Sequence, residues 1–497
     1  MSRRVLRVLR DDRAATARAL LIARGAIALY LVELVANLTR PRLQPDEPSL
    51  SIFYRMPSGI TKMPGLSDSF EKLMAMPVAV FWTVLAGIAA GVLIQVFVAV
   101  TRQPDRRAAV LTWVTLGLLL LPFGLIPLVV MIEYLPVTLA CLPSTAFVLL
   151  LLRGGVRFAR VPLAALLAAF GWGALIVFGL GRAYTGLAFA TISGYMIPKD
   201  YLNPSGGDLS LGLGRFTASI FRSIDLVVVH LGVVNVLVVA AGVLMLLLLF
   251  RHHITDTVTG LTLGAAVGLG YSFVESILFI KIYGTFGSVL GTTGGFEYWI
   301  RQSIGLLGGQ VALGAVLGAG LTLAARAQRR ALVASAALVA AIGGATAAET
   351  LSGWLSGRIG GQVETGSALD TLVVSPLIWL LPQLPFIALA VVLLVLGLRE
   401  RAVMLRAAAA AETATGRAAI TPTEEPVLVS PAQRLWVVAG TWRRHGAGTA
   451  LRLHRLQSAQ LELASWWAQN DPDLEPQGDE LRARVLRLKG ARTVVGS

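Results

Sequence analysis

Apolar runs of about 20 residues recur along roughly the first 400 positions of this 497-residue chain. A helix of about that length crosses the roughly 30 Å hydrocarbon core of a bilayer. Hydrophobic residues make up 55% of the chain and charged residues only 14%, which is unlike the composition of an ordinary soluble protein. The runs therefore predict an all-α fold, a polytopic bundle of transmembrane helices.

About ten spans are expected along the chain. They fall near residues 17–38, 77–100, 108–132, 136–152, 162–183, 224–250, 257–282, 304–325, 331–349 and 371–398. The short connectors after alternate spans are basic, and such connectors stay on the cytoplasmic side. This pattern predicts a multi-pass protein of the cell membrane, inner or plasma, with its N- and C-termini in the cytoplasm.

Three regions follow from this pattern: a cytoplasmic N-terminal segment (1–16), a transmembrane domain (17–398) and a cytoplasmic tail of amphipathic helices (399–497). Ser430 and Pro431 are typical of a helix start, an N-cap followed by a first-turn proline. The apolar positions of this tail helix and of a last short helix are Leu453, Leu456, Leu463, Trp467, Leu481, Val485 and Leu488. These two helices are expected to pair with each other or to lie on anionic lipid.

The net charge of +15 is typical of proteins that bind nucleic acid, but its placement argues against that class. Arg and Lys crowd the connectors between apolar runs, which is how membrane proteins set their orientation. The expected partners are therefore membrane lipids and not nucleic acid. The single cysteine, Cys141, lies within an apolar run, so we expect a packing role and no disulfide framework.

Ionisable side chains at span depth mark candidate sites, because they persist there only with a partner, water or a function. Asp256 opens one span and Glu275 lies several turns further on, with Tyr271 one turn before it on the same face. Glycines at four-residue spacing precede Glu275, a pattern that lets a neighbouring helix approach closely. These glycines are Gly260, Gly264 and Gly268, with Gly270 nearby.

Three further places carry polar groups. Arg301 stands at the edge of the next span and Gln310 lies within it, among Gly305, Gly309, Gly314 and Gly318. Glu349 ends the ninth span, near Trp354. The sixth span contains Asp225, His230 and Asn235, of which only His230 has an ordinary pKa suited to proton transfer near neutral pH.

Two stretches of the chain carry a family resemblance. The first contains Asp256, Gly260, Gly268-Leu269-Gly270-Tyr271, Glu275 and Phe279. The second contains Arg301, Gly309-Gln310, Gly314 and Gly318. Together they resemble the PrsW family of intramembrane proteases, relatives of the CPBP (CAAX-processing) membrane proteases. The resemblance covers residues 251–330 and extends to a core of about 224–354, and it implies peptidase activity within the membrane.

The chain differs from the family pattern at two points. The family's paired glutamates with a following lysine are missing, because residues 224–250 contain no glutamate. Gln310 stands where the family has histidine, and glutamine neither shuttles protons nor binds metals well. The histidines that remain nearby in the sequence are His230, His252 and His253.

Three functions stay open. The first is a PrsW-like scaffold or regulator with a degenerate or rearranged catalytic set, which binds transmembrane segments of other proteins. The second is an active intramembrane peptidase, and the third is a small-molecule or lipid transporter, which is compatible with interior Glu33, Glu275 and His230. Glu275 and His230 are the candidate catalytic residues. The candidate supporting or binding residues are Tyr271, Asp256, Arg301, Gln310 and Glu349. Without a catalytic role, Glu275 is expected to be held neutral or to pair with Arg301 or His230. No metal ligand is assigned, and the cofactor is left open.

Overall fold

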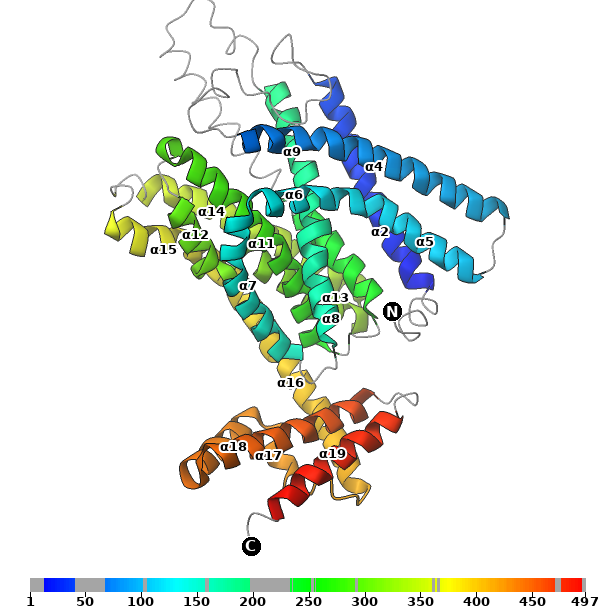
Figure 1. Ribbon diagram of the computed structural model, residues 1–497, viewed down its shortest axis with the longest axis vertical. Coiled ribbons are helices and arrows are strands. Elements are labelled where there is room, and N and C mark those ends of the chain that lie inside the picture. Colours follow the sequence, from blue (N-terminus) through cyan, green and yellow to red (C-terminus); the bar gives the residue numbers. More distant parts are fainter. Residues whose placement is uncertain are drawn as a thin grey trace, which may run out of the picture. The chain divides into compact units, whose positions relative to one another are not determined.

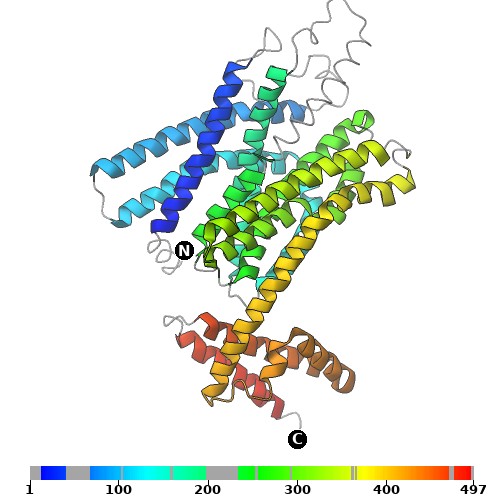
Figure 2. The same cartoon turned by 180° about the vertical axis from the view of Figure 1, so that it is seen from behind.

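A computed structural model describes residues 13–40, 68–101, 105–156, 161–196, 233–234, 236–251, 254, 256–290, 294–359, 363, 367–469 and 475–493. All regular structure in these ranges is helical, as Figures 1 and 2 show from two sides. The all-α fold predicted from the apolar runs is confirmed. The chain forms two compact units, one made mostly of residues before 392 and one made mostly of residues after it.

The first unit contains the apolar helices of the predicted transmembrane domain. Their bounds are α2 (Arg13–Thr39), α4 (Asp68–Thr101), α5 (Asp105–Leu120), η1 (Leu121–Gly124), α6 (Leu125–Glu133), α7 (Leu135–Val156), α8 (Leu163–Gly171), η2 (Trp172–Val177), α9 (Phe178–Met196), α11 (Thr257–Leu290), α12 (Gly294–Gln302), η5 (Ile304–Leu307), α13 (Gly309–Arg326), α14 (Arg330–Ile359), η7 (Asp370–Val374), α15 (Ser375–Leu380) and η8 (Leu381–Gln383). The last few residues of α7 and the first few of α11 belong to the second unit.

Nine helices among the described residues are long and apolar enough to cross a membrane. They correspond to nine of the ten expected spans. The remaining one, expected at 224–250, is described from residue 233 onward, and its apolar helix runs over Val236–Leu249. Residues 224–232 of that span lie outside the described residues.

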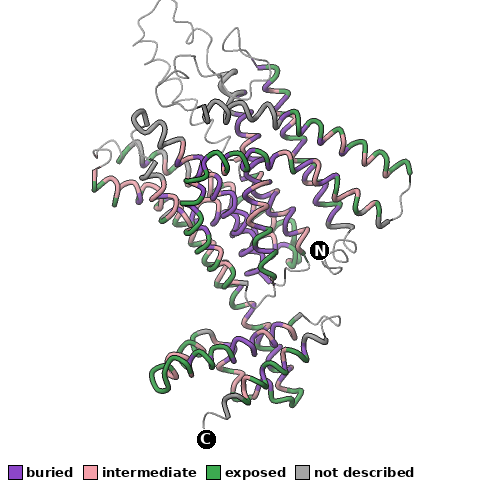
Figure 3. The backbone as a smooth tube through the Cα atoms, viewed as in Figure 1, coloured by how far each residue is buried: buried purple, intermediate pink, exposed green. Residues whose placement is uncertain are grey.

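Helix α11 lies at the centre of its unit. Within its most apolar stretch 83% of the residues are buried, against 6% in α14, so α11 is surrounded by protein and α14 presents most of its surface outward. Figure 3 shows this contrast, with buried backbone concentrated where α11 and α13 lie. Cys141 of α7 is fully buried, which confirms its packing role.

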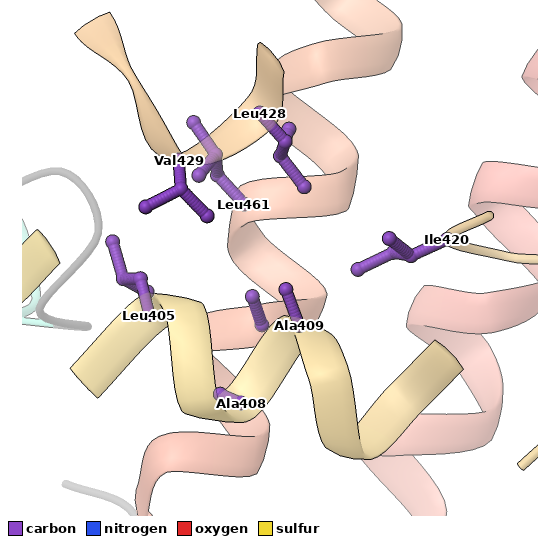
Figure 4. Close-up of a cluster of buried hydrophobic side chains, with 8 residues drawn as sticks. Leu405, Ala408, Ala409, Ile420, Leu428, Val429 and Leu461 are labelled. Atoms are coloured by element: carbon purple, nitrogen blue, oxygen red, sulfur yellow. The ribbon is translucent and has the colours of Figure 1, made fainter. Parts of the chain in front are cut away.

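The second unit contains the end of α16 (Leu384–Ala414), α17 (Glu425–Val429), α18 (Pro431–Gln469) and α19 (Glu475–Thr493). The start of α18 confirms the predicted helix start, and the backbone N–H of Gln433 donates to the Ser430 hydroxyl at 3.4 Å. Figure 4 shows one of its two apolar clusters, in which Leu405 and Ala409 of α16 meet Leu428 and Leu461.

The second apolar cluster joins α18 to α19. Leu456 and Leu463 of α18 pack with Val485 of α19, and Leu481 and Leu488 lie against them. The predicted apolar stripes of both helices therefore meet each other, which confirms that the two helices pair.

Buried charge also organises this unit. Arg482 of α19 donates from Nε to both oxygens of Glu412, at 2.9 and 3.1 Å, and the indole N–H of Trp467 donates to the same carboxylate. The Glu412 side chain is fully buried. Burial alone would lower the pKa of Arg482, but its hydrogen bonds to Glu412 and Asp479 and their charges raise it above its ordinary value.

Candidate functional site around Glu275

Helix α11 approaches α13 so closely that only glycine fits at the contacts. A Cβ placed on Gly264 would overlap the backbone carbonyl of Gly314, and one on Gly268 would overlap that of Gln310. Gly260 meets Gly318 and Thr322 in the same way. These contacts confirm the helix packing predicted from the four-residue glycine spacing, and they fix the register of α11 against α13.

A second set of glycine contacts packs α11 against the end of α8 and against η2. A Cβ on Gly270 would overlap the carbonyl of Phe170, and one on Gly173 would overlap that of Val267. The segment Trp172–Val177 is a π-helix, a widening of the helical turn that is frequent at functional sites. The stretch of α11 before Glu275 is therefore closely packed on two sides, by α13 and by η2.

Glu275 forms an ion pair with Arg301 of α12. The Oε2 atom of Glu275 lies 3.9 Å from Nη1 of Arg301, and each side chain is 23% exposed. The guanidinium of Arg301 also stacks over the ring of Phe279, 4.4 Å from its centroid, one turn beyond Glu275. Of the two partners expected for Glu275, Arg301 therefore lies within ion-pair distance, and His230 is outside the described residues.

A second arginine faces the same carboxylate. Arg182 of α9 is partly buried and interacts electrostatically with Glu275 and Tyr271. We did not single it out from the sequence, because it stands near the end of the expected span 162–183. Two cations and one carboxylate therefore form the charged centre of this unit.

Tyr271 of α11 and Gln310 of α13 are two further candidate residues of this unit. Tyr271 is buried and stacks edge-to-face on Phe178 of α9, with ring centroids 5.2 Å apart. The side-chain oxygen of Gln310 is buried and, within the described part of the chain, has no hydrogen-bond partner. An amide in that position offers a hydrogen bond to a bound molecule but no proton transfer.

Asp256 lies about five turns before Glu275 along the chain and serves a different purpose. It caps α11, because its Oδ1 accepts the backbone N–H of Thr259 at 2.8 Å. Arg401 of α16 donates hydrogen bonds to the same carboxylate from Nε and from Nη2, the latter at 2.8 Å. Its Nη1 donates to the carbonyl of Gly155. Arg401 is a further residue that the sequence analysis missed.

The surroundings of Asp256 shift its titration. Burial alone would raise the pKa of this carboxyl, but the hydrogen bonds and charge of Arg401 and the hydrogen bonds from Thr259 hold it below its ordinary value. Asp256 therefore stays charged in the folded protein at neutral pH.

Two predicted site residues are not placed beside Glu275. His230 lies outside the described residues, as do His252, His253 and Asp225. Glu349 belongs to α14, but its side chain is outside the described part. Glu33 of α2 lies within the bundle, where it accepts a hydrogen bond from the Tyr184 hydroxyl at 3.3 Å.

Residues 161–352 match a family model described as PrsW family intramembrane metalloprotease. This segment belongs to the PrsW family. No curated protein and no solved structure matches the chain. The PrsW match begins at residue 161, so it also covers α8, η2 and α9 and includes Arg182, whereas the resemblance in the sequence was limited to about 224–354. With its apolar helices, the PrsW match makes the chain a multi-pass integral membrane protein.

The PrsW description implies a metal, and the described residues around Glu275 do not fit one. A catalytic zinc site takes about three protein ligands from His, Cys, Asp and Glu. No group of three such side chains occurs among the described residues, and the described groups that interact with the Glu275 carboxylate are the guanidiniums of Arg301 and Arg182. The arrangement binds charge and donates hydrogen bonds, and no hydrolytic step follows from it.

Proposed function

We propose that this protein is a PrsW-family membrane protein with a rearranged catalytic set, which binds transmembrane segments of other membrane proteins instead of hydrolysing them. The observation that carries the proposal is the ion pair between Glu275 and Arg301, with Arg182 interacting electrostatically with the same carboxylate. Peptide hydrolysis needs a water activated by a base or a metal. Here the one acid of the centre faces two permanent cations.

Binding follows from the same geometry. The 3.9 Å separation of the Glu275 and Arg301 atoms is longer than a direct hydrogen bond, and both side chains are partly accessible. A guanidinium carries five N–H donors, so it can bind an acceptor of a second segment in addition to those it already has, and lipid tails offer no competing acceptor. Unpaired carbonyls or an acidic side chain of a neighbouring span supply such acceptors, so polar, kinked transmembrane segments are the expected ligands.

The test is co-expression with a panel of tagged single-span reporter proteins. We expect reporters to co-purify at full length, and Arg301→Ala to reduce co-purification. Glu33→Ala, which removes another acid of the bundle, is the matched control and should leave reporter binding unchanged. Reporter cleavage that persists in Glu33→Ala but disappears in Glu275→Ala would overturn the proposal.

An active peptidase is the second candidate, favoured by the description of the matching family. Its catalytic pair would be Glu275 with His230, the histidine of the sixth expected span. The same reporter panel separates the candidates, since His230→Ala abolishes cleavage only if that pair works.

We also propose that the protein resides in the inner or plasma membrane with both termini in the cytoplasm. The support is the concentration of Arg and Lys in the connectors that follow alternate spans. Reporter fusions at residues 497 and 330 should both report the cytoplasm, and a fusion in 350–370 should report the opposite side.

A further inference from the structure

Helix α18 has two halves with different surroundings. Gly446, with φ of 80°, breaks the helix, and the half beyond it packs into the apolar clusters of its unit. The half before it carries large apolar side chains that this unit leaves uncovered. Trp436 is 73% exposed, Leu435 69% and Trp442 64%, and Figure 3 shows this stretch as mostly exposed.

These exposed side chains share one face. At 100° per residue, Trp442, Leu435, Ala439 and Trp436 fall within an arc of about 120°. Arg434, on the opposite side, turns toward its own unit, where its guanidinium donates to the carbonyl of Leu428. The tryptophan face, defined by Leu435, Trp436, Ala439 and Trp442, therefore points away from the packed part of the unit.

The charge around this face has one sign. Residues 426–461 contain five arginines and two histidines but no aspartate or glutamate. Arg443 and Arg444 follow Trp442 directly and are exposed. At 100° per residue, Arg443 falls inside the arc next to Trp436, and Arg444 falls beyond Trp436. A tryptophan-bearing arc with exposed arginines at one border is the composition of a helix that lies in the headgroup region of an anionic membrane.

We propose that the tryptophan face of α18 inserts into the interface of an anionic bilayer, where Arg443 and Arg444 bind lipid phosphates. The chain tethers this helix to a bilayer, because residues 415–430 join it to α16, which is part of the last candidate span, Asp370–Ala414. Tryptophan is enriched at membrane interfaces. A basic protein partner is disfavoured, because residues 426–461 contain no acidic side chain to pair with it. For an acidic protein partner, the convex surface of a single helix offers no groove. The inference is independent of the function proposed for Glu275.

The experiment uses the full chain in vesicles. Ala439→Cys places an environment-sensitive fluorophore on the tryptophan face, and Gln433→Cys places one at an exposed position of the same helix outside that face, about 60° beyond Trp436. Cys141, the single native cysteine, is buried, so the unmodified chain treated with the same reagent gives the background. Fluorescence is read with headgroup-level quencher lipids in zwitterionic vesicles and in vesicles containing phosphatidylglycerol.

We expect quenching at residue 439, and little at residue 433, only when anionic lipid is present. Arg443→Gln and Arg444→Gln should each lower the ratio of inserted to free helix roughly fivefold. Arg452→Gln and Arg455→Gln remove equal charge beyond the kink and should change it much less. A fluorophore at 439 that stays open to iodide in every vesicle would overturn the proposal, as would one shielded from both iodide and quencher lipid, because that result indicates a protein partner.

Discussion

Asp256 and Arg401 illustrate how single side chains fix helix ends in this protein. Asp256 caps α11 through Thr259, and Arg401 neutralises it while also holding the carbonyl of Gly155. Both side chains are buried, so neither charge is hydrated if its partner is removed. The pair therefore acts as a structural tie, in contrast to the more open pair at Glu275.

Replacing Arg401 with Gln should destabilise the protein strongly. Removing one partner of a buried ion pair typically costs about 3–5 kcal/mol, because the other charge stays buried and unpaired. Arg399→Gln, an exposed change on the same helix, should have little effect. Thermal unfolding in detergent compares the two variants, and equal melting temperatures would contradict the structural role of Arg401.

The same pair predicts a dependence on pH. Because the folded pKa of Asp256 lies below its unfolded value of about 3.9, its contribution to stability is complete above about pH 5 and is lost as pH falls through the folded pKa. The difference in melting temperature between wild type and Asp256→Asn should therefore shrink below about pH 4. A difference that stays constant from pH 6 to pH 3 would contradict this assignment.

The acidic members of the ion pairs at Asp256 and Glu275 were easier to predict from the sequence than the arginines. Glu275 and its pairing with Arg301 were predicted, because a glutamate inside an apolar run is conspicuous and Arg301 opens the next span. Arg182 and Arg401 were missed, since each lies near the end of an apolar run, where an arginine usually reaches the membrane surface. Their partners are also remote in sequence, and 145 residues separate Arg401 from Asp256.

Among the helices, α11 and α13 depend on glycine for their distance of approach. Gly264→Ala should destabilise the bundle by about 1–3 kcal/mol or more, because the added methyl meets the backbone of Gly314, which cannot move aside. Gly343→Ala in α14 is the matched control, with nothing within 4 Å of its added Cβ. Melting temperatures of the two variants that fall equally would contradict the tight packing.

Glycine spacing predicted that another helix packs closely against α11, but it did not identify which helix. The contact with α13 follows from a second set of glycines, Gly314 and Gly318, whose complementarity is a tertiary property. The π-helix at Trp172–Val177 was not predicted, since its sequence reads as an ordinary apolar run. Helix positions are therefore readable from the sequence, while the register between helices is not.

In the tail, α19 is held by a buried charge as well as by apolar contacts. Arg482→Gln should loosen α19 from α16, because Glu412 of α16 then stays buried without its cation. Arg487→Gln, an exposed change on α19, should not. Limited proteolysis of the intact protein provides the measurement, and equal cleavage rates of α19 in both variants would contradict the role of Arg482.

The unit that contains the candidate spans combines a tightly packed interior with an apolar exterior. The length of the apolar runs predicted the fold class, because a bilayer constrains helix length more strongly than any soluble core does. The candidate centre was predicted only in part. Its acid was visible in the sequence, whereas the set of side chains that face it depends on how α9, α11 and α12 converge.

A double-mutant cycle on Glu275 and Arg301, read as melting temperatures in one detergent, tests most directly whether these two side chains form a stabilising ion pair. If they do, Glu275→Gln and Arg301→Gln each lower the melting temperature. The double variant is then no less stable than the less stable single variant, which corresponds to a coupling of about 0.5–3 kcal/mol. A Glu275→Gln variant that is more stable than wild type, with effects that simply add, would mark Glu275 as a strained functional acid and contradict the ion-paired centre.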